Sequence, residues 1–121
     1  MSSSPRVSII IPLFNDEDFV ATALQSCLAQ TLVDIEIICV DDASTDATVE
    51  IVEEIRRRDA RVRLIRQPEN RSAFQARRVG IEAANAPYIL FLDGDDELAP
   101  HAASATLRRA ASTKADVVCL L

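Results

Sequence analysis

At 121 residues the chain has the length of one domain or part of one, and with 49% hydrophobic and 26% charged residues its composition is ordinary for a globular core. Its formal net charge of −6 argues against nucleic acid as a partner, because an acidic protein gains no affinity from counterion release. No stretch approaches the roughly 18 apolar residues of a membrane span, and the N-terminus lacks a signal-peptide pattern. We therefore expect a cytoplasmic protein, and attachment to the cytoplasmic face of a membrane through other segments stays open.

Short apolar runs and longer amphipathic segments alternate along the chain. In chain order, the predicted strands cover residues 7–11, 35–40, 62–65, 88–92 and 116–121. The predicted helices between them cover about residues 17–30, 44–59, 72–84 and 100–111. Asn15 or Asp16 can cap the first helix, and Pro100 suits the first turn of the last one. Five strands that alternate with four helices predict an α/β fold with three layers and a mostly parallel, doubly wound sheet.

Several charged and sulfur-bearing side chains have structural interpretations. In the second predicted helix, Glu53 with Arg57 and Glu54 with Arg58 have the i,i+4 spacing of helix ion pairs. The three cysteines lie far apart, without metal-ligand spacing, and we interpret them as small core residues in a reducing compartment. His101 is the only histidine, so a metal site built on it would lack imidazole partners.

The most highly charged turn, Asp93-Gly94-Asp95-Asp96-Glu97, directly follows the predicted strand 88–92. Two like charges ~4 Å apart repel by about 1 kcal/mol in water and about 4 kcal/mol near a protein surface. Either water screens such a turn or a hard cation lies among its oxygens, and carboxylates suit Mg²⁺ or Mn²⁺. Because ligands of open α/β sheets bind at the carboxyl ends of the strands, the position favours a cation site.

Two further loops follow predicted strands in the same way. Pro12-Leu13-Phe14-Asn15 follows the first strand, and the loop 41–46 follows the second. If strands one and four are neighbours and strand two flanks strand one, all three loops share one crevice. A carboxylate in the second loop could then accept hydrogen bonds from a base or a ribose. Turn and capping chemistry explains Asp41-Asp42 equally well, and capping accounts for Ser44 and Asp46.

Four segments of the chain resemble, in order and spacing, the motifs of the family 2 inverting glycosyltransferases. These segments are Pro12 to Asn15, Val40 to Asp46, Asn70 to Gly80 and Phe91 to Asp96. The resemblance covers essentially the whole chain and implies a GT-A fold, of which residues 1–121 would form the N-terminal, nucleotide-sugar-binding part. The acceptor-binding part and the catalytic base would lie downstream, so no catalytic residue is assigned here. We therefore expect a longer parent protein.

The resemblance also implies roles for individual side chains. Pro12 and Phe14 would line the base pocket, and Asp42 would hydrogen-bond the base. Arg77 would approach the diphosphate. Asp93 would lie near the ribose and share with Asp95 a Mg²⁺ or Mn²⁺ ion that is bound to the phosphates.

The activity implied for the parent is transfer of a sugar from a nucleotide-diphosphate sugar, first of all a UDP-sugar, to an acceptor hydroxyl with inversion. The acceptor could be a saccharide, a lipid or a protein. We expect the chain alone to be inactive. Ser72 and Arg78 depart from the family pattern, since they replace a glycine and an asparagine, and we expect Arg78 on a solvated helix face.

Alternatives to this interpretation use parts of the same pattern. A nucleotide-binding module without turnover fits the residues present, and a haloacid-dehalogenase-like phosphotransfer domain also has D-x-D after a strand. That phosphotransfer class leaves Asp41-Asp42 and the loop 12–15 unexplained. An EF-hand fails because Leu98 replaces the required glycine, and two glycines cannot form a dinucleotide fingerprint. A cut sheet edge would favour pairing into a homo-oligomer.

Overall fold

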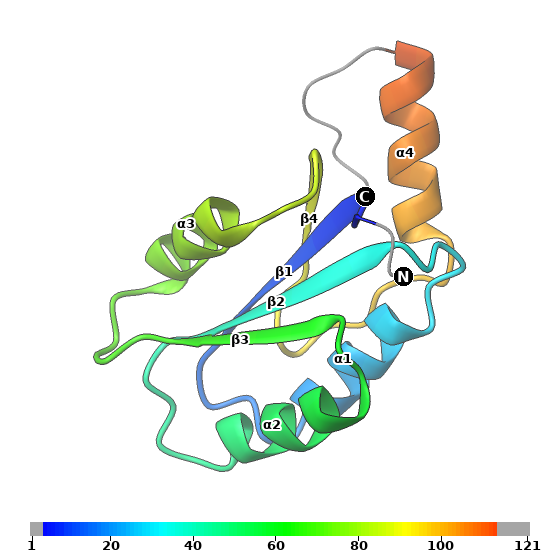
Figure 1. The fold of residues 1–121 in the computed structure, drawn as a ribbon. Coiled ribbons are helices and arrows are strands. Elements are labelled where there is room, and N and C mark those ends of the chain that lie inside the picture. Colours follow the sequence, from blue (N-terminus) through cyan, green and yellow to red (C-terminus); the bar gives the residue numbers. More distant parts are fainter. Residues whose placement is uncertain (1–3, 114–121) are drawn as a thin grey trace.

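Four apolar segments form one parallel sheet in the computed structural model, which describes residues 4–113 (Figure 1). The strands are β1 Val7–Leu13, β2 Ile35–Asp41, β3 Val62–Arg66 and β4 Tyr88–Phe91. Their order is β3-β2-β1-β4, and all three pairings are parallel. Strands one and four are therefore neighbours and strand two flanks strand one, which is the arrangement that brings the three loops together. The fifth predicted strand lies outside the described residues.

Helices cover both faces of the sheet, which confirms the three-layer α/β prediction. The helices are α1 Val20–Leu28, α2 Thr48–Arg58, α3 Ala73–Ala83 and α4 Ala102–Thr113. Side chains of α1, α2 and α4 join the larger core on one face, and α3 packs on the other (Figure 1). All residues of β1 and β2 are buried, because both central strands are covered from both sides.

The small residues of α3 let it lie close to the sheet. A Cβ atom added to Gly80 would lie 2.5 Å from Cγ2 of Ile10 on β1, closer than real Cβ contacts allow. Ile10, Ile38, Val40 and Ala76 form the buried cluster on this face. The close approach places the first turn of α3 beside the carboxyl ends of the strands.

The start of the first helix differs from its prediction. Helix α1 begins at Val20 and has no side-chain cap, so the prediction that Asn15 or Asp16 caps it is wrong. The backbone N–H groups of Phe19 and Val20 instead donate to the carbonyl oxygen of Asp16. The side chains of Asn15 and Asp16 accept hydrogen bonds from loop backbone, which leaves them unavailable for capping.

The second helix also begins late, at Thr48. Asp46 supports this start, since its Oδ1 accepts from the backbone N–H of Thr48 at 3.0 Å. Ser44, the other capping candidate, hydrogen-bonds with Asp41 and Asn15 instead. The N-cap residue is Ala47, so Asp46 supports the first turn of α2 from one position earlier, and Ser44 does not cap it.

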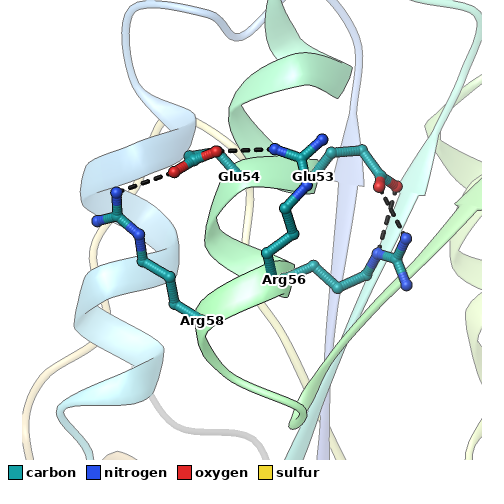
Figure 2. Close-up of polar contacts among 5 residues, drawn as sticks. Glu53, Glu54, Arg56 and Arg58 are labelled. Atoms are coloured by element: carbon teal, nitrogen blue, oxygen red, sulfur yellow. Dashed lines mark hydrogen bonds and ion pairs between the residues drawn. The ribbon is translucent and has the colours of Figure 1, made fainter.

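An ion-pair ladder runs along the exposed face of α2 (Figure 2). Glu54 pairs with Arg58 at 2.8 Å, as predicted, and also with Arg57 at 2.8 Å. The predicted pair of Glu53 with Arg57 is wrong, because Arg56 takes Glu53 at 2.7 Å. Water and salt screen pairs this exposed, so they contribute little to the stability of the domain.

A polar cluster lies near the amino ends of the strands, on the α3 face. Glu36 accepts from Ser8 at 2.6 Å, from the backbone N–H of Asn85 at 2.6 Å and from Arg63 at 2.9 Å. Burial acts to raise the pKa of Glu36, but these hydrogen bonds outweigh it and hold the pKa below its ordinary value. The cluster thereby fastens the segment before β4 to β1, β2 and β3.

Two further predictions concern the described part of the chain. Cys27 and Cys39 are buried free thiols, as expected of core residues, and Cys119 lies outside the described residues. Between residues 4 and 113, no helix is both long and apolar enough to cross a membrane.

Candidate functional site

The loops after β1, β2 and β4 meet in one crevice at the carboxyl edge of the sheet. The crevice holds about 210 Å³ and is lined by Pro12, Leu13, Phe14, Asp16, Asp42, Ala73, Ala76, Asp93, Gly94 and Asp95. It therefore includes five of the six site residues that were predicted from sequence. The sixth, Arg77, does not line the crevice but contacts one residue that does.

Asn15 ties the first loop to the second. Its backbone N–H donates to Oγ of Ser44 at 2.9 Å, and its side-chain oxygen accepts from the N–H of Thr45 at 2.9 Å. Asn15 has a φ of 53°, a left-handed conformation that asparagine tolerates better than most residues. This turn leaves Phe14 at the rim of the crevice with 47% of its surface exposed.

The two aspartates of the second loop have different surroundings. Asp41 is buried and accepts from the N–H and the hydroxyl of Ser44, so it stabilises its own loop. Asp42 is 3% exposed and accepts from the backbone N–H groups of Arg71 and Ser72, at 2.8 and 2.9 Å. Each of its oxygens keeps a second lone pair, so a ligand in the crevice could still hydrogen-bond to Asp42.

Holding Asp42 requires an unusual backbone at Ser72. This residue has φ 103° and ψ 158°, a region that glycine occupies and other residues avoid. Ser72 stands where the motif that the chain resembles has a glycine, the residue that suits this conformation best. Its hydroxyl accepts from the N–H of Gln75 at the start of α3.

The loop after β4 brings three carboxylates together. Oxygens of Asp93, Asp95 and Asp96 lie within 4.8 Å of one another, and all three residues are exposed. Three hard oxygen donors at this spacing fit Mg²⁺ or Mn²⁺. Asp93 and Asp95 were predicted as metal ligands from sequence, whereas Asp96 was not, although the consecutive Asp95-Asp96 pair is visible in the sequence.

Arg77 reaches the same loop from α3. Its guanidinium lies 3.2 Å from Oδ1 of Asp93, and the two side chains are 40% and 58% exposed. A pair this exposed contributes at most about 1 kcal/mol, so a ligand could separate it at little cost. Arg78 points away into solvent and pairs with Glu82, as expected of a solvated helix face.

Asp16 also lines the crevice, although the sequence had suggested it as a cap of the first helix. Its Oδ2 accepts from the backbone N–H of Phe14 at 3.0 Å. A Cβ atom on Gly94 would lie 2.5 Å from the same oxygen, so the acidic loop packs directly on this carboxylate. Burial raises the pKa of Asp16, and the nearby charges of Asp95, Asp46 and Asp93 add to the rise.

Residues 8–121 match the family model of Glycosyl transferase family 2, and the chain belongs to this family. It is similar to the glycosyltransferase EpsJ of Bacillus subtilis (strain 168), with 50% identity over 92 residues. That match covers 76% of this chain and 26% of EpsJ. The haloacid-dehalogenase alternative does not agree with this membership.

Two solved structures share the fold. The chain matches S. aureus TarS 1–349 in complex with UDP at a TM-score of 0.81 and 26% identity, over 88% of this chain and 32% of that one. It matches the mannosyltransferase PcManGT from Pyrobaculum calidifontis, in complex with GDP-Man and Mn²⁺, at a TM-score of 0.75 and 25% identity. The second match covers 90% of this chain and 32% of that one. The predicted GT-A fold is thus confirmed, and the chain spans about a third or less of the length of these relatives.

Proposed function

We propose that the chain is the nucleotide-sugar-binding part of a glycosyltransferase that uses a nucleoside-diphosphate sugar, first of all a UDP-sugar. One observation carries the proposal: an apolar wall, a buried carboxylate and an acidic loop line the same crevice. A nucleotide needs these three surfaces, for its base, its polar edge and its diphosphate. TarS in complex with UDP and PcManGT with GDP-Man and Mn²⁺ support the choice of ligand.

The base would lie on the side of the crevice formed by the first two loops. Pro12 and the half-exposed ring of Phe14 offer apolar contact, and Asp42 offers an acceptor to a base N–H. The carboxylate is already held by two backbone N–H groups, so little ordering would be needed on binding. A volume of about 210 Å³ suits a nucleoside better than a whole sugar nucleotide.

The diphosphate would lie toward the loop after β4. Asp93 and Asp95 would hold Mg²⁺ or Mn²⁺ together with Asp96, and Arg77 could exchange Asp93 for a phosphate oxygen. Bound there, the cation would neutralise charge on the departing nucleoside diphosphate. The residues of this chain bind and orient the donor in this proposal.

The parent protein would transfer the sugar to an acceptor hydroxyl with inversion. The acceptor oxygen bonds to the anomeric carbon as the bond to the phosphate oxygen breaks on the opposite face. A general base takes the hydroxyl proton, and this chain supplies no assigned residue for that step. We therefore expect the chain to bind a UDP-sugar without measurable transfer.

Calorimetric titration of UDP into the chain, with and without Mn²⁺, tests the proposal. We expect binding that Mn²⁺ strengthens, and loss of that metal dependence in Asp95→Ala. Asp34→Ala is the matched control, because it removes a carboxylate that precedes β2 at the opposite edge of the sheet. Absence of binding under both conditions would contradict the proposed function. Equal behaviour of the two variants would remove Asp95 from the metal role.

A further inference from the structure

Asp16 contacts the first loop, the start of α2 and the loop after β4, although it has no role in the function proposed so far. Its carboxylate accepts from the N–H of Phe14 in the first loop, and its own N–H donates to Oγ1 of Thr48 at 2.9 Å. Thr48 is fully buried at the start of α2, so this second bond fixes the Asp16 backbone to the body of the domain. On its third side the carboxylate packs against Gly94.

Resting on the proposed function, we propose that Asp16 is a positioning residue that couples the nucleobase side of the crevice to its cation side. It acts on the base side by holding the backbone of Phe14. It acts on the cation side through its charge and its contact with Gly94, the residue between Asp93 and Asp95.

Gly94 packs closely on Asp16 and, beside it, on Leu13 of β1, where an added Cβ atom would lie 2.6 Å from Cδ2. The added-Cβ position at Gly94 is 2.5 Å from Oδ2 and 2.8 Å from Cγ of Asp16, so no side chain fits between the two loops. A shift of the acidic loop must therefore move the Asp16 carboxylate, and with it the hydrogen bond to Phe14.

The negative charge of Asp16 lies next to the three carboxylates that could bind a metal ion. Within the described part of the chain, the carboxylates that could share one ion are Asp93, Asp95 and Asp96, and Asp16 is not among them. A negative charge next to such a group attracts a cation to it and repels a phosphate that arrives without one. Asp16 should therefore make nucleotide binding depend more strongly on the metal.

Two substitutions separate the charge from the hydrogen bond. Asp16→Asn removes the charge but keeps a side-chain oxygen that can accept from Phe14. Asp16→Ala removes both. Asp34→Asn is the control, because it changes the net charge equally at the opposite edge of the sheet. The 121-residue chain is titrated with Mn²⁺, with UDP in the presence and absence of Mn²⁺, and with uridine alone, below the unfolding temperature of each variant.

We expect Asp16→Asn to weaken Mn²⁺ binding by about tenfold, while uridine affinity stays unchanged and metal-free UDP affinity does not fall. Asp16→Ala should show the same loss of metal affinity and bind uridine about fivefold more weakly, since Phe14 loses its acceptor. Unfolding temperatures are recorded alongside, because a purely structural role would lower them without changing these affinities.

The outcomes distinguish this inference from the function on which it rests. If the unsubstituted chain binds UDP with Mn²⁺ and both Asp16 variants match Asp34→Asn, the positioning role is wrong and the proposed function stands. If the unsubstituted chain binds no UDP at all, both fail. If Asp16→Ala does not fold, the comparison of Asp16→Asn with Asp34→Asn still decides the charge effect.

Discussion

Glu36 at the amino end of the sheet and Asp16 at the carboxyl end are carboxylates with opposite surroundings. At the amino end, Glu36 is almost fully hydrogen-bonded and its pKa is lowered. At the carboxyl end, Asp16 is partly buried beside other carboxylates and its pKa is raised. The charge of Glu36 holds neighbouring strands together, whereas the charge of Asp16 is left, among the described residues, without a cationic partner beside the crevice that a ligand can enter. Hydrogen-bonded carboxylates also lie at the carboxyl end, Asp42 among them, so what sets Asp16 apart is its place beside other carboxylates.

Removing Glu36 should have the largest effect on stability. Glu36→Ala leaves the buried hydroxyl of Ser8 without its acceptor and removes the carboxylate partner of Arg63, which keeps only the carbonyl oxygen of Ala83, so we expect a loss of about 3 kcal/mol. Urea unfolding measures the free energy. UDP affinity of the folded protein should stay unchanged, and a loss below about 0.5 kcal/mol would contradict the structural role.

The two glycines offer a matched pair, because an alanine Cβ at either would lie 2.5 Å from a neighbouring side-chain atom. Gly94→Ala should weaken Mn²⁺-dependent UDP binding by at least about tenfold, since the acidic loop must move off Asp16. Gly80→Ala should instead lower the free energy of unfolding by about 1–3 kcal/mol, because α3 must move off Ile10, and binding should change little. Calorimetry and urea unfolding on both variants check this, and the same response at both positions would break the distinction between the two ends.

Backbone strain should also be confined to the carboxyl end. Ser72→Gly restores the residue that suits a φ of 103°, and we expect it to raise stability by about 1 kcal/mol despite the loss of the weak hydrogen bond to Gln75. Urea unfolding measures the gain. A lower free energy of unfolding in the variant would mean that the serine hydroxyl matters more than the strain.

The pH dependence of stability should have opposite signs for Glu36 and Asp16. The contribution of Glu36 is fully present above its ordinary pKa of 4.5 and is lost as the pH falls through its lowered folded-state value. The folded-state pKa of Asp16 is raised above 3.8, so its unfavourable effect at neutral pH is relieved as the pH falls through that raised value.

Unfolding free energies from pH 7 to pH 3 test both signs. Glu36→Gln should lose less stability than the unsubstituted chain as the pH falls below 4.5. Asp16→Asn should be more stable than the unsubstituted chain at pH 7, and the advantage should shrink as the solution is acidified. An advantage that does not vary with pH would show that the Asp16 charge is not its source.

Four of the five predicted strands lie in the described residues and are confirmed, whereas the meeting of the three loops was predicted only for the strand order that the structure has. Buried parallel strands require continuous apolar runs, and the carboxyl ends of parallel strands share one edge. The acidic turn after β4 could therefore be predicted from sequence as a candidate cation site.

The parts that sequence reasoning missed depend on contacts between distant residues. Asn15, Asp16 and Ser44 look like helix caps locally, but they bond across loops that lie about 30 positions apart. Neither periodicity nor propensity registers such contacts, so helix starts were placed too early and Asp16 was given to a helix rather than to the crevice. The functional roles of Pro12 and the other predicted site residues stay predictions until binding is measured.

The double link between Asn15 and the second loop has a consequence for how a ligand would be received. Asn15 donates to Ser44 and accepts from Thr45, and these two hydrogen bonds fix the first and second loops to each other when the domain folds. Because the two loops are already ordered in the free protein, a nucleotide that binds between them does not have to order them. We therefore expect fast association and little induced fit on this side of the crevice. Any slow, ligand-driven rearrangement should be sought in the acidic turn opposite.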